Sequence, residues 1–83
     1  MHQRVAPNKM FFTIIVQTYS RMKHESNPDY KSMLQYLDHT EKNVLPMFHD
    51  SESDYEFNVY RVLLWSTRST VFWRAKLKQQ GMR

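Results

Sequence analysis

The segment from residue 54 to residue 80 contains neither proline nor glycine, the residues that most strongly disfavour a helix interior. Just before it, Ser53 and Glu56 have the spacing of a capping box. In that motif the serine hydroxyl accepts from the Glu56 backbone N–H, and the glutamate reaches back to the serine N–H. Gly81 follows the segment, where a C-terminal cap favours glycine. These signals predict one helix over 54–80, roughly 40 Å long at about 1.5 Å per residue.

Two shorter helices are predicted ahead of it, over residues 9–23 and 28–43. Asn8 is the expected N-cap of the first helix. Asn27 is expected to cap the second, with Pro28 at its first position, where the missing N–H costs nothing. The residues predicted to face inward are Phe11, Ile15, Tyr19 and Met22, widened by Phe12 and Val16, in the first helix, and Tyr30, Met33, Leu34 and Leu37 in the second.

The composition favours a single all-α domain over residues 1–83. A β-sandwich or barrel needs turn residues every 8–12 positions or so, whereas this chain has one glycine and three prolines. We therefore expect a three-helix antiparallel bundle with a long basic C-terminal helix, and an apolar elbow at residues 45–48 between the second and third helices. The third helix is longer than the other two can cover, so its C-terminal part is expected to project or to dock elsewhere.

Charge is distributed in three blocks. Residues 25–56 carry −6, residues 57–83 carry +6 with no acid, and residues 1–24 carry +4. One interpretation is that the middle block neutralises the ends within the fold. The other is that a helix of one sign faces an acidic partner, such as nucleic acid, an acidic protein or anionic lipid. The basic, acid-free start is also a property of mitochondrial presequences, but its apolar spacing favours a folded helix.

The long helix is apolar on two sides. Its inner seam is predicted at Phe57, Tyr60, Leu64, Thr67, Val71 and Ala75, which follow three-four spacing. Trp65 and Trp73 lie eight positions apart and share a second side, with Val62 and Ser69 between them. A helix that is apolar on two sides needs either two neighbours in its own fold or one neighbour and an external partner. Both interpretations are open at this stage.

Catalytic, cofactor and metal sites are not predicted. The four histidines are scattered, and none belongs to the His-x-x-x-His pair of a helical zinc site. The one glycine cannot build a phosphate-binding loop, and acids such as Asp54 and Glu56 are explained by helix capping. No apolar run approaches the ~18 residues of a membrane-spanning helix. We therefore expect a soluble, intracellular protein that is not an enzyme.

The third helix resembles a known family in its sequence. Val59-Tyr60-Arg61, followed by Leu63-Leu64 and Arg68, is similar to the leucine-tyrosine-arginine motif of the small mitochondrial LYR proteins, with valine in place of the leading leucine. Its position near the C-terminus is closer to a divergent branch, the mitochondrial complex V assembly factors, which Tyr60-x-x-Leu63-Leu64-x-Ser66-x-Arg68-x-x-Val71 resembles. LYR proteins are basic three-helix accessory subunits or assembly factors of respiratory complexes, and many bind the acidic acyl carrier protein. The resemblance implies that Tyr60, Arg61 and Arg68 contact such a partner.

A second local resemblance competes with the first. Ser53-x-x-Glu56-Phe57-x-x-Tyr60-x-Val62-Leu63-Leu64 is similar to a stretch of the helical mRNA-export scaffold family that contains a PCI-type domain. That domain is far longer than 83 residues, so this match requires the chain to be a fragment of it.

The sequence thus predicts a non-catalytic accessory or assembly subunit of a multi-subunit, mitochondrial complex, without a cofactor. The residues predicted to bind the partner are Tyr60, Arg61, Trp65, Arg68, Phe72, Trp73, Arg74, Lys76 and Lys78. The alternative is a small basic nucleic-acid-binding protein, because the same helix combines phosphate-neutralising cations with aromatic rings on which bases stack. No zinc finger, RNA-recognition signature or helix-turn-helix pattern accompanies it.

Overall fold

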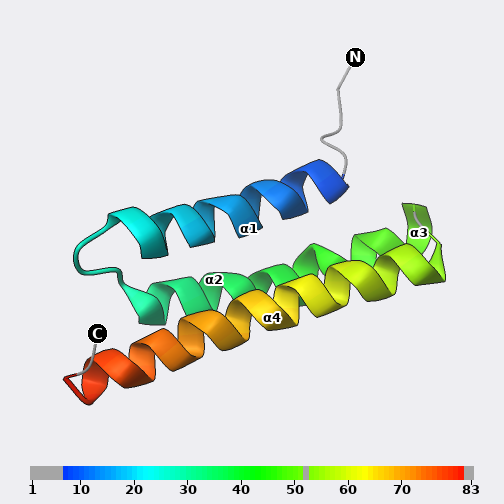
Figure 1. Cartoon of the computed structure of the whole chain (residues 1–83). Helices are drawn as coiled ribbons and strands as arrows, with labels where there is room; N and C mark the ends of the chain where they lie inside the picture. The colour runs from blue at the N-terminus through cyan, green and yellow to red at the C-terminus, as the bar shows by residue number, and fades with distance from the viewer. Residues whose placement is uncertain (1–6, 52, 82–83) are drawn as a thin grey trace.

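The protein is a bundle of three long helices joined by one turn and one short helical elbow (Figure 1). The computed structural model describes residues 7–51 and 53–81, and neither range contains a β-strand. The elements, in chain order, are α1 (Pro7–His24), α2 (Tyr30–Asn43), the 3₁₀ turn η1 (Leu45–Met47), the one-turn α3 (Phe48–Ser51) and α4 (Asp54–Gln79). The predicted all-α, three-helix architecture is confirmed. No helix among these residues is long and apolar enough to cross a membrane.

The start of α1 differs from the prediction. The helix begins at Pro7, so Asn8 lies within its first turn instead of capping it. The Asn8 side-chain oxygen accepts from the neighbouring Lys9 N–H at 2.7 Å. Proline suits the first turn because its ring holds φ near the helical value and the N–H it lacks would have no partner there.

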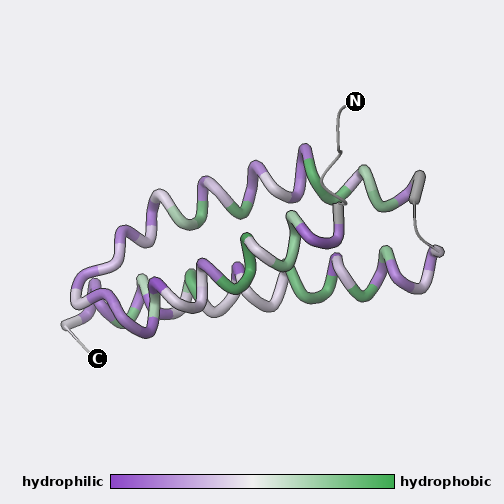
Figure 2. The backbone as a smooth tube through the Cα atoms, turned by 90° about the horizontal axis from the view of Figure 1, so that it is seen from above, coloured by the Kyte–Doolittle hydropathy of each residue, from purple (hydrophilic) through white to green (hydrophobic). Residues whose placement is uncertain are grey.

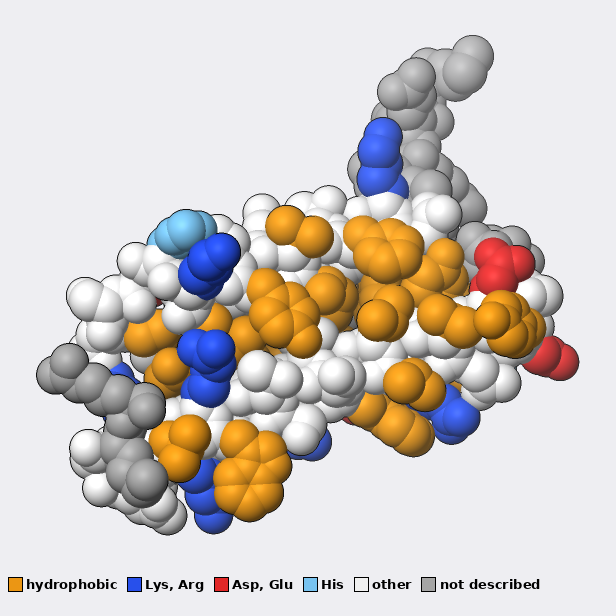
Figure 3. All heavy atoms as spheres, in the orientation of Figure 1, with side chains coloured by type: hydrophobic (Ala, Val, Ile, Leu, Met, Phe, Trp, Pro, Cys, Tyr) orange, Lys and Arg blue, Asp and Glu red, His pale blue; other side chains and the backbone are white. Residues whose placement is uncertain are grey.

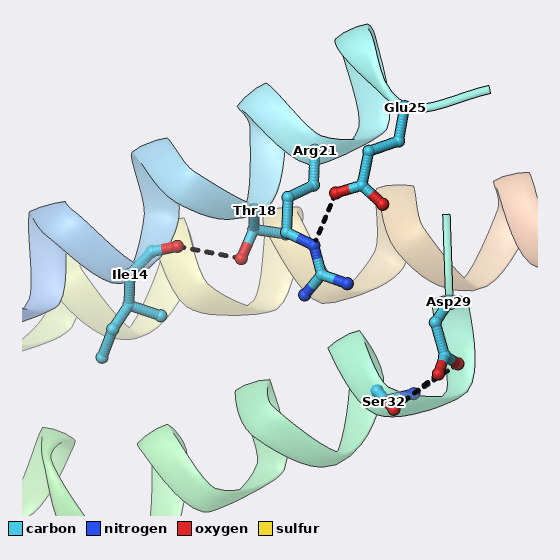
Figure 4. A network of polar contacts seen from close by, with 6 residues as sticks. All are labelled: Ile14, Thr18, Arg21, Glu25, Asp29 and Ser32. Carbon is cyan, nitrogen blue, oxygen red and sulfur yellow. Dashed lines mark hydrogen bonds and ion pairs between the residues drawn. The ribbon is translucent and has the colours of Figure 1, made fainter. Parts of the chain in front are cut away.

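The start of α2 is also displaced, by two residues. Its N-cap is Asp29 rather than Asn27, and Pro28 lies buried ahead of the helix. An Asp29 carboxylate oxygen accepts from the Ser32 backbone N–H at 3.1 Å, and the Ser32 hydroxyl donates to the other oxygen at 2.8 Å (Figure 4). These bonds, the backbone one first, stabilise the ionised carboxylate and lower the pKa of Asp29 below its ordinary value.

Both ends of α4 follow the sequence signals. The Ser53 hydroxyl oxygen accepts from the Glu56 N–H at 3.2 Å, as predicted. The reciprocal half of the capping box differs, because Glu56 accepts from the serine hydroxyl and not from its backbone N–H. Gly81 has φ +75°, and its N–H donates to the Lys78 carbonyl at 3.0 Å. A left-handed residue after the last turn is the position at which glycine has no steric penalty.

An aromatic cluster lies at the centre of the core. Phe11 of α1, Phe48 at the elbow and Tyr60 of α4 meet with ring centroids 5.6, 5.4 and 4.3 Å apart. The aliphatic core residues around them are Ile14, Ile15, Met22, Met33, Leu37, Val44, Leu45, Leu64 and Val71. The predicted inner seam of α4 is confirmed at Tyr60, Leu64, Thr67 and Val71, which are all buried.

The buried side of α1 is rotated from the prediction. Tyr19 is 42% exposed, whereas Ile14 and Thr18 are buried in its place. Thr18 can lie in the core because its hydroxyl donates to the Ile14 carbonyl one turn back, at 2.8 Å (Figure 4). Phe12 and Val16, predicted to widen the inward stripe, are exposed instead.

The C-terminal part of α4 does not project. The elbow continues α2 past Asn43, so that α2, η1 and α3 together cover much of the length of α4 (Figure 1). At the other end, the Lys78 ammonium donates to the Asn27 side-chain oxygen and lies 5.8 Å from the Tyr30 ring centroid. The last turns of α4 therefore contact the α1–α2 connection. Figure 2 shows that this end of the bundle is largely hydrophilic.

Candidate protein-binding surface

The residues predicted to bind a partner occupy different environments along α4. Tyr60 is 9% exposed, and its ring stacks on Phe48 and contacts the edges of Phe11 and Phe12. It is therefore a core residue, the role that its place in the inner seam also predicts. The LYR resemblance implies that Tyr60 contacts a partner, but its ring is buried and is not available for such a contact.

Arg61 and Trp65 lie together on the side of α4 that faces α2. The Arg61 guanidinium carbon is 4.7 Å from the Trp65 ring centroid, and its Nη2 donates to the Asn58 side-chain oxygen at 2.8 Å. The Arg61 Nε is buried without a hydrogen-bond partner among the described residues. The Trp65 indole N–H donates to the Glu41 carboxylate of α2 at 3.3 Å, yet 46% of this residue is exposed.

Arg68 also contacts α2, through an ion pair. Its Nε lies 2.7 Å from an Asp38 carboxylate oxygen, and each side chain is about half exposed. An ion pair that is exposed to this degree contributes at most about 1 kcal/mol. The contact nevertheless directs the Arg68 side chain toward α2.

Phe72, Trp73 and Lys76 are exposed and contact only one another among the rings and charges of the described residues. Phe72 is 44% exposed and Trp73 is 60% exposed, with their rings edge to face at 5.9 Å. The Lys76 ammonium lies 5.2 Å from the Phe72 ring centroid. A shallow hollow of about 260 Å³ runs beside them, lined by Trp65, Arg68, Ser69 and Phe72. We name Arg61, Trp65, Phe72, Trp73 and Lys76 the tryptophan face.

The remaining two predicted residues, Arg74 and Lys78, lie at the end of the bundle. They line an open hollow of about 790 Å³ between the last turns of α4 and the α1–α2 connection. Its other lining residues are Met22, Glu25, Ser26, Pro28, Tyr30 and Leu77. Glu25 is paired with Arg21 at 3.0 Å, and Lys78 donates a hydrogen bond to Asn27. Among the described residues, Arg74 is the cation of this hollow whose side chain has neither an ion pair nor a hydrogen bond.

One exposed apolar surface was not predicted from the sequence. Phe12, Val16 and Tyr19 form an exposed stripe on α1, and Val59, Leu63 and Leu77 form another on α4. Figure 3 shows hydrophobic side chains gathered over α1 and α4 on one face of the molecule. The four- and three-residue spacing of these stripes is visible in the sequence. Phe12, Val16 and Tyr19 were, however, predicted to belong to the inward face of α1.

No metal-ligating cluster is found in residues 7–51 and 53–81, where no three histidine or acidic residues come together. The His49 ring packs on the Phe57 ring instead, with centroids 3.7 Å apart. Comparison with known protein families, curated proteins and solved structures finds no match. The LYR and PCI resemblances stay predictions.

Proposed function

We propose that the chain is a non-catalytic helical subunit that docks on another protein through the tryptophan face. The observation that supports this proposal is the exposure of three large aromatic side chains, Trp65, Phe72 and Trp73, on one helix. Tryptophan and arginine are the residues that most often dominate the energy of protein interfaces. A helix that is apolar well beyond its buried seam is typical of one that has a second neighbour.

The size of the face indicates what the partner must supply. Each of these rings buries about 150–250 Å² when fully covered, and about half of that remains exposed. Covering all three would bury roughly 300 Å², which is worth about 7 kcal/mol before any cost of association. Association itself costs about 4–15 kcal/mol. The aromatic rings alone therefore give weak binding, and the cations beside them must also be engaged.

The charge around the face favours an acidic partner. Arg61 and Lys76 have no carboxylate within ion-pair distance among the described residues, whereas Arg68 is paired with Asp38. The Lys76 and Arg61 side chains lie against aromatic rings of the same helix, so their charges are preorganised in the free protein. An acidic protein that covers the rings would gain charge pairs at the same time. An acyl carrier protein in the mitochondrion is the partner that the LYR resemblance implies.

The test compares two aromatic residues of equal exposure. Phe72 belongs to the face and is 44% exposed, while Tyr36 lies on α2, outside it, and is 45% exposed. Tagged wild type, Phe72→Ala and Tyr36→Ala chains are purified from cells of the source organism, and the retained proteins are quantified by mass spectrometry. We expect wild type and Tyr36→Ala to retain the same acidic protein, and Phe72→Ala to retain at least tenfold less.

Two results would overturn the proposal. Equal retention by all three chains would show that the tryptophan face is not the docking site. Binding of RNA or DNA that weakens steeply between 50 and 200 mM salt, with no retained protein, would favour the nucleic-acid alternative. A fluorescent fusion that stays outside mitochondria would remove the mitochondrial part of the proposal and leave the docking face untouched.

A further inference from the structure

A second stripe, apolar toward both ends and small and polar at its centre, runs along α4 apart from its buried seam. Its residues are Val59, Leu63, Ser66, Thr70, Trp73 and Leu77, and we name them the outer seam. They alternate at spacings of four and three, the a/d repeat of a helix that packs lengthwise against another helix. All are exposed except Thr70, which is half-buried. No helix of the described chain covers this seam.

Helix α1 widens the same face of the molecule. Phe12, Val16 and Tyr19 are exposed on α1, and the Phe12 ring lies 5.5 Å from the Tyr60 ring of α4. Figures 1 and 3 show α1 and α4 side by side on this face, with hydrophobic side chains over both. The outer seam is thus one half of a two-helix surface.

We propose that this face is the interface of a homodimer in which the α4 helices of two copies pack antiparallel. The order of residues in the seam is self-complementary when reversed about its centre, between Ser66 and Thr70. Reversal sets Leu63 opposite Trp73 and Val59 opposite Leu77 of the second copy. It also sets Ser66 opposite Thr70, so that the small residues allow close approach at the centre. Such a two-fold interface uses the same patch on both copies.

The charges at the ends of α4 decide the direction of packing. Asp54 and Glu56 lie in its first turn, and Arg74 and Lys76 lie near its end. Figure 3 shows acidic side chains at the end of the face where α4 begins, and cations gathered toward the end where it finishes. A parallel copy would place like charges together. An antiparallel copy places the acidic start of each helix beside the basic end of the other, and it also opposes the two helix dipoles.

The area of the face is close to what a stable dimer buries. At about 1.5 Å per residue, α4 is about 39 Å long and α1 about 27 Å, and each is about 10 Å across, so the two helices together present roughly 660 Å² per copy. A specific interface of standard size buries about 800 Å² on each partner. The inference does not depend on the docking function proposed above, because the outer seam and the tryptophan face share only Trp73.

The first test places a charge at the centre of the seam. The Thr70 hydroxyl donates to the Ser66 carbonyl at 3.0 Å, and the Thr13 hydroxyl donates to the Lys9 carbonyl at 2.9 Å. Thr13 lies on the side of α1 opposite its buried residues, so Thr13→Glu is a matched control for Thr70→Glu. By analytical ultracentrifugation, we expect wild type and Thr13→Glu to be dimers at micromolar concentration. We expect Thr70→Glu to keep its helical circular dichroism and to dissociate with a Kd at least 100-fold higher.

A monomeric wild type at 100 µM would overturn the proposal, and so would equal dissociation of both variants. Thr70→Glu should still retain the partner that Phe72→Ala loses, which separates failure of the dimer from failure of the docking function.

The second test uses milder changes and reads the direction of packing. The chain contains no cysteine, so single introduced thiols report on one contact each. Ser66→Cys and Thr70→Cys chains that differ in tag length are mixed and oxidised. Antiparallel packing predicts mainly disulfide-linked heterodimers, because Ser66 of one copy lies opposite Thr70 of the other. A predominance of either homodimer would indicate parallel packing and would overturn the proposed geometry.

Discussion

Tyr60 is the residue at which the structure and the LYR resemblance make opposite predictions. The structure gives its ring three aromatic neighbours, Phe11, Phe12 and Phe48, at centroid distances between 4.3 and 5.5 Å. Truncating a buried aromatic ring to alanine costs about 3–5 kcal/mol, because both burial and the contacts of its neighbours are lost. A chain of 83 residues has a total unfolding free energy of roughly 4–12 kcal/mol. Tyr60→Ala should therefore remove about a quarter or more of the stability.

Urea unfolding followed by circular dichroism at 222 nm measures this loss. With a slope of about 1 kcal/mol per molar urea, the midpoint should fall by about 3–5 M, or the variant should be unfolded before urea is added. Tyr60→Phe keeps the ring and should change the free energy of unfolding by less than about 1.5 kcal/mol. If Tyr60→Ala kept its midpoint within about 0.5 M of wild type and lost only partner binding, Tyr60 would be a surface contact, and the core assignment would be wrong.

Two helix caps give smaller, independent predictions. Ser53→Ala should lower the free energy of unfolding by about 1 kcal/mol in the same assay, because the first turn of α4 loses the acceptor of its cap bond; an unchanged midpoint would show that this bond adds no stability. The folded-state pKa of Asp29 lies below its ordinary value of 3.8, so its contribution is present above that value and is lost as the pH falls through the lower folded-state pKa. Asp29→Asn keeps a capping side chain but cannot titrate. Below pH 4, this variant should lose less thermal stability than wild type as the pH falls. An equal loss in both would show that Asp29 does not cause it.

The helices were predictable because their signals are local. The absence of proline and glycine from α4, the serine cap before it and Gly81 after it are all short-range features, and the observed helix ends within one residue of the predicted boundary. The starts of α1 and α2 were misplaced by two residues because more than one residue near each start could begin the helix. Pro7 could start α1 ahead of Asn8, and Asp29 could replace Asn27 as the cap of α2. For α2, the choice depends on how the α1–α2 connection packs, which a single sequence does not display.

The surface was less predictable than the fold, because exposure depends on the neighbours of a helix. The apolar residues of α1 form a stripe that is too wide for the neighbouring elements to cover. Their spacing alone does not indicate which edge of the stripe stays exposed to solvent. Tyr19 was expected to be buried, but Ile14 and Thr18 are buried instead. Thr18 can lie in the core because its hydroxyl donates to a carbonyl of its own helix. On α4, the aromatic and cationic residue types predicted a binding face, yet their partners on α2, Glu41 and Asp38, depend on how α2 and α4 align.

The alignment of α2 with α4 also accounts for part of the charge pattern. Placing the acidic block of the chain against its basic helix produces the Arg68–Asp38 ion pair and the Trp65–Glu41 hydrogen bond, so the two blocks do meet within the fold. This neutralisation is incomplete, because Arg74 and Lys76 lie beyond the reach of the acids of α2. The acids at the start of α4 are separated from them by most of the length of the helix, roughly 30 Å at about 1.5 Å per residue, and no side chain spans that distance. At the basic end, Glu25 lines the same hollow as Arg74 but is paired with Arg21. A second molecule would bring further charges of opposite sign to both ends at once. An acidic partner on the tryptophan face would meet the basic end alone, whereas an antiparallel copy on the outer seam would meet both.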